Sequence, residues 1–184
     1  QSGLSRRGFF ASAVAGCALS NRTGIWLRAD DRDYPLVDYH VHLDDVVTLE
    51  KALQLSRERN VTFGIVEHAG TRANKYPGLL STDDDLKNYL AKLEGKPILK
   101  GIQAEGLDWP TCFSKDVVAQ LDYVLSDALT FPEKDGGRVE LWRPTVKIDD
   151  KQDFMERYTD FNVQVIEREP LDIVANPTFL PGCI

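Results

Sequence analysis

Residues 36–42 read Leu-Val-Asp-Tyr-His-Val-His, and this stretch decides the fold. Val37 and Val41 alternate with polar residues, a pattern that predicts a β-strand with one polar face. Because residues two apart on a strand project to the same side, His40 and His42 are expected to reach a common metal ion.

Strand and helix patterns alternate along the rest of the chain. Short apolar runs rich in β-branched residues predict buried strands, and amphipathic runs opened by Ser, Thr or Asp predict helices. The predicted strands are residues 36–42, 61–66, 98–104, 123–126 and 171–175. The predicted helices are residues 49–59, 86–93, 115–121 and 149–158. This alternation, without an internal repeat, predicts an α/β fold built on a parallel sheet.

The length of the chain bears on which α/β fold this is. A closed α/β barrel usually needs about 250 residues and eight strand-helix units. The chain has 184 residues, and five strands are predicted in it. The simplest interpretation is an incomplete, distorted (β/α) barrel, in which residues 30–184 form a C-terminally truncated barrel domain. A small open α/β sheet is the alternative.

The first 29 residues differ from the rest in charge. They carry four arginines and no acidic residue, and the pair Arg6-Arg7 precedes Phe-Phe and a small apolar run. This order resembles a twin-arginine export signal, and residues 14–17 (Val-Ala-Gly-Cys) resemble the lipobox of bacterial lipoproteins. We therefore expect residues 1–29 to be an export signal and linker, and the protein to be periplasmic or attached to the membrane through a lipid on Cys17. The alternative is a frayed helix with a buried cysteine.

The composition is that of a globular domain, with 42% hydrophobic and 28% charged residues and a net charge of −7. An acidic chain without a stripe of Lys and Arg in its body argues against a nucleic-acid partner, because neutralising phosphates requires clustered cations. The acidic composition does not exclude a small anionic substrate. The three cysteines, Cys17, Cys112 and Cys183, have no metal-type spacing, and we expect those of the body to be reduced.

All three histidines are predicted to lie at the carboxyl ends of the first two strands, the edge where ligands bind in parallel α/β folds. His68 ends the second strand and is expected to converge on His40 and His42. Glu105 shares a face of the third strand with Gln103 and is the expected fourth ligand. Three imidazole nitrogens and one carboxylate suit Zn, Mn or Fe. The alternative is that the histidines are interior residues with ordinary hydrogen bonds and that Glu105 is a rim charge.

Several segments resemble motifs of the PHP (polymerase and histidinol phosphatase) family. An Asp-x-His-x-His motif, an acid-His pair after an apolar strand, a glycine-led motif that ends in glutamate and two later strands occur in the family's order. Asp127 and Asn176 depart from the family, which has histidine at both positions. The segments are residues 38–42, 64–68, 100–105, 121–126 and 171–177.

The resemblance implies a distorted seven-stranded α/β barrel with two or three divalent metal ions at the strand ends and the hydrolysis of phosphate esters. It implies His40, His42, His68 and Glu105 as metal ligands. A divalent ion lowers the pKa of bound water to about 7, so hydroxide is available near neutral pH. We expect Glu67 or Asp127 to shuttle the proton.

The loop after the second strand, residues 70–78, is expected to overhang this edge. Its Arg72 and Lys75 are expected to contact an anionic group of a small-molecule substrate, with a solvated loop as the alternative. Trp109 and Trp142 are expected either to wall the pocket or to serve only in packing. Two other functions stay open: hydrolysis of amides or lactones, as in the amidohydrolase superfamily, and binding of a sugar or sugar phosphate without cleavage by an envelope protein.

Overall fold

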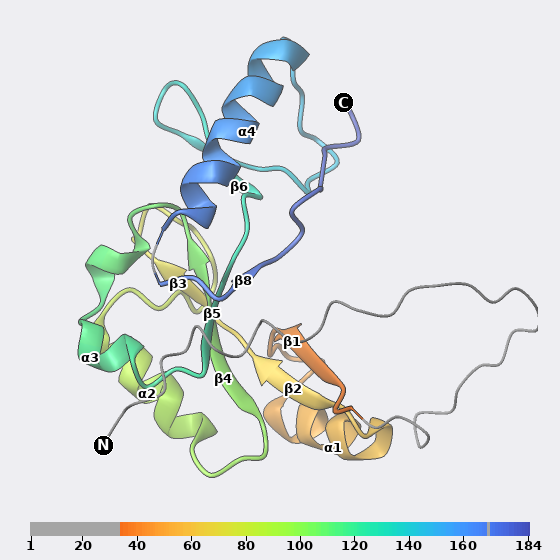
Figure 1. Cartoon of the computed structure of the whole chain (residues 1–184), viewed down its shortest axis with the longest axis vertical. Helices are drawn as coiled ribbons and strands as arrows, with labels where there is room; N and C mark the ends of the chain where they lie inside the picture. The colour runs from red at the N-terminus through yellow and green to blue at the C-terminus, as the bar shows by residue number, and fades with distance from the viewer. Residues whose placement is uncertain (1–33, 169) are drawn as a thin grey trace, which may run out of the picture. The chain divides into compact units, whose positions relative to one another are not determined.

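A parallel sheet forms the centre of the structure, a computed structural model in which residues 34–168 and 170–184 are described. In spatial order its strands are β1 (Val37–Val41), β2 (Thr62–Ile65), β4 (Leu99–Glu105), β5 (Tyr123–Ser126) and β8 (Ile173–Val174), and β3 (His68–Gly70) pairs with β4 beyond the end of β2. All of these pairings are parallel. The sheet curls into a half-barrel (Figure 1), which confirms the α/β class and is consistent with the predicted incomplete barrel.

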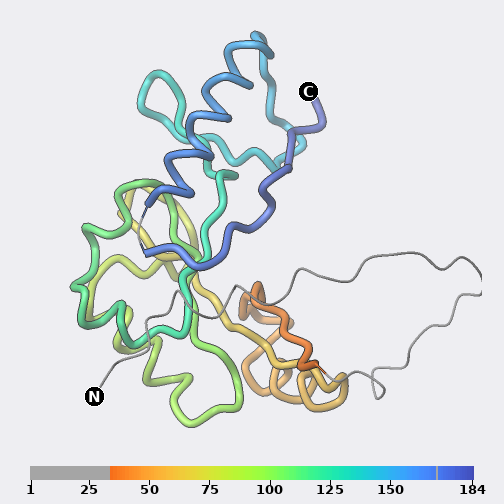
Figure 2. Tube along the Cα trace, in the orientation of Figure 1, coloured from red at the N-terminus to blue at the C-terminus, as the bar shows by residue number. Residues whose placement is uncertain are grey.

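Helices and one antiparallel hairpin surround this sheet. The helices are α1 (Leu49–Arg59), α2 (Asp83–Leu93), the 3-10 helix η3 (Trp109–Cys112), α3 (Lys115–Val118) and α4 (Lys151–Ile166), and the hairpin consists of β6 (Thr130–Pro132) and β7 (Arg138–Glu140). The trace in Figure 2 leaves the sheet after β5, passes through the hairpin and α4 and returns to the sheet at β8. Within the described ranges, no helix is both long and apolar enough to cross a membrane.

The helix starts follow from capping side chains. Thr48, Thr82 and Asp150 accept hydrogen bonds from the backbone N–H of the third residue of α1, α2 and α4. Ser114, which precedes the predicted helix over 115–121, makes no side-chain cap bond to it, and its backbone N–H donates to Asp83 Oδ1 of α2 at 2.7 Å. The helix that follows is correspondingly a single turn, shorter than the predicted span.

Helix α4 is longer than the sequence pattern predicts. The predicted helix ends at residue 158, whereas α4 continues to Ile166 because Phe161 and Val165 extend its buried face. That face packs with Phe131 of the hairpin in a hydrophobic cluster of its own. The segment between β5 and β8, which contains the hairpin and α4, is therefore stabilised by a separate set of apolar contacts.

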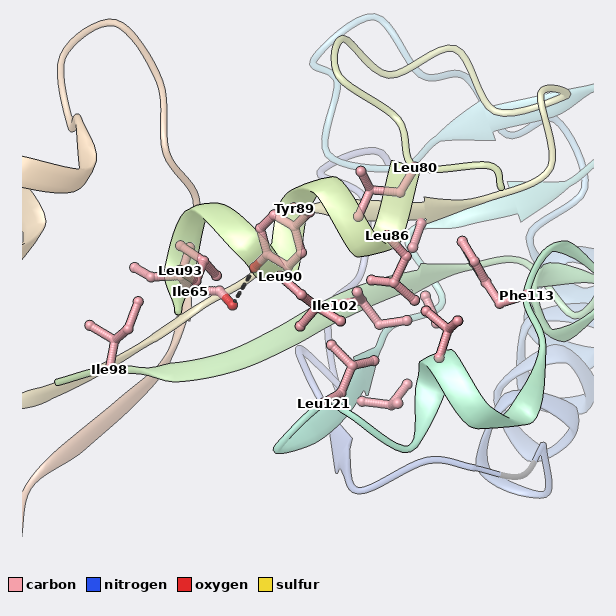
Figure 3. Packing of buried hydrophobic residues seen from close by; sticks show 14 of the residues in the cluster. Ile65, Leu80, Leu86, Tyr89, Leu90, Leu93, Ile98, Ile102, Phe113 and Leu121 are labelled. Atoms are coloured by element: carbon pink, nitrogen blue, oxygen red, sulfur yellow. Dashed lines mark hydrogen bonds between the residues drawn. The ribbon is translucent and has the colours of Figure 1, made fainter. Parts of the chain in front are cut away.

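The largest hydrophobic cluster lies between the sheet and the helices α1 to α3 (Figure 3). It includes Leu86, Leu90 and Leu93 of α2 and Ile65 and Ile102 of the sheet. Tyr89 of α2 is 6% exposed, and its hydroxyl lies 2.8 Å from the carbonyl oxygen of Ile65 and 2.9 Å from that of Gly101. A single helix hydroxyl thus lies within hydrogen-bond distance of carbonyls on two neighbouring strands where β2 ends, and the two carbonyls share its one hydrogen.

Tyr89→Phe is expected to lower the free energy of unfolding by about 1–3 kcal/mol, because two buried carbonyls lose this donor while the ring stays in place. Urea denaturation of the full chain measures the effect. The matched control is Tyr34→Phe, since Tyr34 is 63% exposed. Equal midpoints for Tyr89→Phe and the wild type would contradict the assigned bridge.

The inner face of the half-barrel carries Tyr123, which lies across two glycines. A Cβ on Gly64 would stand 2.4 Å from the Tyr123 hydroxyl, and one on Gly101 would stand 2.3 Å from its Cζ. Gly101 is also the direct cross-strand partner of Tyr123. The hydroxyl donates to the carbonyl of Tyr39 at 2.7 Å, so the ring spans β1, β2, β4 and β5. The two glycines make room for it.

The predicted export signal and lipid anchor, including Arg6, Arg7 and Cys17, lie outside the described residues, as do residues 30–33 of the predicted domain. They stay predictions. Cys112 and Cys183 are free thiols in the structure, as expected from their spacing.

Candidate functional site

The polar residues predicted from the strand pattern meet at the carboxyl edge of the sheet. His40 lies near the end of β1 and His42 just after it, His68 opens β3, and Gln103 and Glu105 end β4. Their rings and side chains contact one another, as the distances below show. Two later strands add one residue each, Asp127 directly after β5 and Asn176 shortly after β8.

Three ligand-type atoms form a tight triangle at the centre of this cluster. The Nε2 atoms of His40 and His42 are 3.2 Å apart, and each lies 2.8 Å from Oε1 of Gln103. Ligand atoms about 2.0–2.1 Å from an ion stand about 2.8–3.4 Å apart at neighbouring coordination positions. The triangle therefore has the dimensions of one face of a metal site, and His40, His42 and Gln103 could hold an ion.

The orientation of the Gln103 amide is fixed by two carboxylates behind it. Its Nε2 donates to Glu105 Oε1 at 3.1 Å and to Asp127 Oδ2 at 3.3 Å, and the Gln103 side chain is buried. Because carboxylates accept and do not donate, the NH₂ group must face them, and the amide oxygen must face the histidines.

His68 and Glu105 pair with each other beside the triangle. His68 Nδ1 lies 2.8 Å from Glu105 Oε1, and Glu105 is 1% exposed. A carboxylate that accepts from one imidazole nitrogen fixes the tautomer, which leaves the lone pair on Nε2. The His68 ring stacks on that of His42, with centroids 4.6 Å apart at 23°. Of the four predicted metal ligands, His40 and His42 converge directly, whereas His68 and Glu105 form the adjoining pair.

Burial sets the charge state of the site. It lowers the pKa of His42 to about 4, assisted by the neighbouring His68 and His40. His42 is consequently neutral near pH 7, with its ring able to act as a ligand. Burial and the charge of Glu105 raise the pKa of Asp127 to about 6, against the hydrogen bonds from the Leu129 N–H and the Asn176 side chain.

These two shifts predict opposite pH dependences for the metal-free protein. The lowered pKa of His42 gives stability that is present at neutral pH and lost as pH falls towards 4, because the unfolded chain binds the proton first. The raised pKa of Asp127 gives stability that is present in acid and lost as pH rises towards 6. Between pH 4 and 6 the two contributions oppose each other.

Asp127→Asn is therefore expected to make the free energy of unfolding rise more steeply between pH 4 and 6 than in the wild type. Urea denaturation with chelator present, repeated at intervals across this range, measures the slope. Parallel curves for the two proteins would show that Asp127 keeps an ordinary pKa.

The structure separates the two residues predicted to shuttle a proton. Asp127 is in contact with the cluster, because its carboxylate accepts a hydrogen bond from Gln103 Nε2. Glu67 is half-buried, and its Oε2 lies 3.4 Å from where a Cβ on Gly78 would stand. Burial raises its pKa, and the charges of His68 and Lys92 lower it. The hydrogen bonds of the described residues include none from the Glu67 carboxylate to the cluster, although its main-chain carbonyl accepts from the Gln103 N–H at 2.9 Å.

The loop after β3 covers the cluster through an aromatic side chain. Tyr76 stacks on His68, with centroids 3.8 Å apart at 9°, and Trp142 lies nearly parallel to Tyr76 at 6.3 Å and 20°. Arg72 and Lys75 of the same loop are exposed. The pKa of Asp85 at the start of α2 is lowered mainly by the hydrogen bond from the Ser81 N–H, and the charge of Arg72 adds a smaller effect in the same direction. Trp109, the other tryptophan expected near the site, is 2% exposed and packs on Phe113 in the main cluster.

The sequence did not predict the role of Arg138, which contacts both the loop after β3 and the segment after β4. Arg138 of β7 donates to Asn74 Oδ1 at 2.6 Å and pairs with Asp108 at 3.4 Å. It also lines a cavity of about 230 Å³ with Gly106 and Thr130, which follow Glu105 and Asp127 closely in sequence. The two strands of this hairpin have three residues each, too few for a periodic pattern that would predict its position near the site.

The sequence does carry a signal for Gln103. Gln103 and Glu105 are two residues apart, the same spacing as His40 and His42, so both pairs are expected to project from one face of their strands. Within the described part of the chain, no group of three or more His, Cys, Asp or Glu side chains is arranged to hold a metal. Comparisons with known proteins find no matching family model, no similar curated protein and no similar solved structure.

Proposed function

We propose that the protein is a metal-dependent hydrolase that acts on phosphate esters. The observation that carries the proposal is the triangle of His40 Nε2, His42 Nε2 and Gln103 Oε1, with its edges of 2.8–3.2 Å, at the carboxyl edge of a parallel sheet. The resemblance of the strand motifs to the PHP family supports the phosphate ester as the substrate class, and the half-barrel of parallel strands agrees with it.

The donor set suits a divalent ion such as Zn, Mn or Fe. Imidazole nitrogen is a ligand for all three, and an amide oxygen adds a hard, neutral donor. Imidazole nitrogens and an amide oxygen are neutral donors when they bind an ion, so the full positive charge of the ion would remain available to an anionic group. A bound ion supplies Lewis acidity, which lowers the pKa of water and polarises a phosphoryl oxygen.

The residues around the triangle have separate roles in the proposed reaction. Gln103 is held in its ligand orientation by Glu105 and Asp127. Asp127, with a pKa of about 6, is able to accept a proton from water near neutral pH and to return it to a leaving oxygen. His68 has its Nδ1 bound to Glu105, which leaves Nε2 as a second group that can accept a proton or a metal ion.

Binding of a sugar phosphate without cleavage is the second candidate. The observation that favours it is the neutral amide of Gln103 in the central triangle, where a charged carboxylate would bind an ion more strongly. Asp127 and Asn176, at positions where the PHP family has histidine, point the same way. This reading requires that a phosphate ligand raise the melting temperature without being converted.

The test uses the full chain purified without chelator. Metal content is measured by elemental mass spectrometry, and phosphate release from 4-nitrophenyl phosphate is measured with Zn, Mn or Fe added singly. The proposal expects near-stoichiometric metal and turnover that stops on chelation and returns with the ion. Metal without turnover on any ester would favour the binding protein, and no metal after reconstitution would overturn the hydrolase.

A further inference from the structure

An aromatic column leads from the histidine cluster towards the surface. His42, His68 and Tyr76 stack in turn, and Trp142 follows nearly parallel to Tyr76. The inner rings are partly buried, whereas Trp142 keeps 41% of its surface exposed. The exposed indole is thus the outermost ring of the column and lies nearly parallel to Tyr76.

The surrounding residues hold both outer rings in place. Leu141, next to Trp142, is 1% exposed, and its N–H donates to the carbonyl of Leu129 at 2.9 Å. On the other side of Trp142, Arg143 pairs with Glu140. Tyr76 is fixed through its hydroxyl, which lies 2.5 Å from Thr130 Oγ1. A large apolar ring is therefore kept partly in solvent on an anchored segment, where its exposed surface is available for stacking.

We propose that Trp142 and Tyr76 form a ring-binding subsite beside the histidine cluster. It takes an apolar ring face, either an aryl group or the C–H face of a sugar, on a ligand whose anionic group lies at His40, His42 and Gln103. Ring faces stack on indole in offset or parallel geometry, and they gain from the burial of both surfaces. The location of the anionic group rests on the proposed function, whereas the ring subsite rests on the aromatic geometry alone.

The test compares ligands that differ only in the ring and cannot be hydrolysed. Methylphosphonate and phenylphosphonate carry the same anionic group, and the C-glycosidic phosphonate analogue of glucose 1-phosphate, in which CH₂ replaces the bridging oxygen, probes the sugar face. Isothermal titration calorimetry of the metal-loaded full chain gives each Kd. We expect phenylphosphonate to bind at least about tenfold more tightly than methylphosphonate, a ratio in the range of one good aromatic stack.

Trp142→Ala is expected to reduce this preference to less than about threefold while leaving the Kd of methylphosphonate unchanged, and Trp142→Phe is expected to keep most of it. Tyr34→Ala is the matched control, because it removes an exposed aromatic ring of the same body, one with 63% exposure. Tighter binding of the glucose phosphonate than of methylphosphonate, lost in Trp142→Ala, would assign the sugar as the natural ring.

Two results would overturn the subsite: an unchanged ring preference in Trp142→Ala, or no binding of phenylphosphonate at a concentration at which methylphosphonate binds. A ring preference that depends on Trp142 but survives chelation would support the subsite and contradict the metal at His40 and His42. Methylphosphonate that binds only with metal, without any ring preference, would do the reverse. The two proposals therefore fail separately.

Discussion

His42→Ala is expected to weaken metal binding by at least about 100-fold and to remove phosphate ester hydrolysis. The variant deletes one of three converging ligand atoms, and changes even outside the ligand set of metal sites cost about 10–100-fold. It also leaves Gln103 Oε1 with one imidazole in place of two. Elemental analysis after dialysis against the free ion, followed by a 4-nitrophenyl phosphate assay, measures both effects.

Gln103→Glu is the matched variant, because it keeps the size of the side chain and exchanges a neutral oxygen for a charged one. We expect it to retain metal but to melt at a lower temperature when metal-free, since it loses two donor hydrogens and adds a third carboxylate beside Glu105 and Asp127. The metal-induced rise in melting temperature is thus expected to exceed that of the wild type. Full metal content in His42→Ala, or no metal effect on Gln103→Glu, would contradict the ligand triangle.

Gly101→Ala is expected to lower the free energy of unfolding by about 3 kcal/mol or more. Its methyl group would stand 2.3 Å from Tyr123 Cζ and below 3 Å from two further ring atoms, so the ring has to move. Overpacking of this kind costs about 1–3 kcal/mol, and displacement of the ring also breaks the bond from its hydroxyl to the Tyr39 carbonyl. Urea denaturation of the full chain measures the loss.

The control for this clash is Gly182→Ala, where an added methyl meets nothing within 4 Å. It is expected to change stability by less than about 0.5 kcal/mol. A double variant, Gly101→Ala with Tyr123→Ala, identifies the cause, since removing the ring removes the clash. It should be more stable than the sum of the two single effects, and strict additivity would mean that the glycine acts through backbone freedom alone.

Periodicity in the sequence predicted the elements that bury a continuous face. β1, β4, β5, α1 and α2 were placed to within a few residues, because their apolar positions recur with period 2 or 3.6 and Thr48 and Thr82 supply the caps. β3 and β6 have three residues each, too few for a period to show. The predicted single strand over 61–66 in fact ends at Ile65, and β3 begins again at His68.

For the candidate site too, the sequence predicted some features and the tertiary structure decided others. The i, i+2 spacing of His40 and His42 and of Gln103 and Glu105 placed four side chains on the correct faces before any contact was known. The tertiary structure decided which of them touch, and it brought the amide of Gln103, not the carboxylate of Glu105, to the two histidines.

The sequence by itself determined the α/β class, the parallel arrangement of the main strands and the edge at which the polar residues gather, because these depend on local periodicity and on a chirality rule common to all such folds. Only the tertiary structure decided the break between β2 and β3 and the contacts of the Tyr89 hydroxyl with two strands. It also decided the packing of Tyr123 on Gly64 and Gly101, and the stacking of Tyr76 on His68 with Trp142 beyond it. Each of these depends on residues far apart in sequence. Their distances are set by how the strands and the excursion through α4 pack together, which no local pattern encodes.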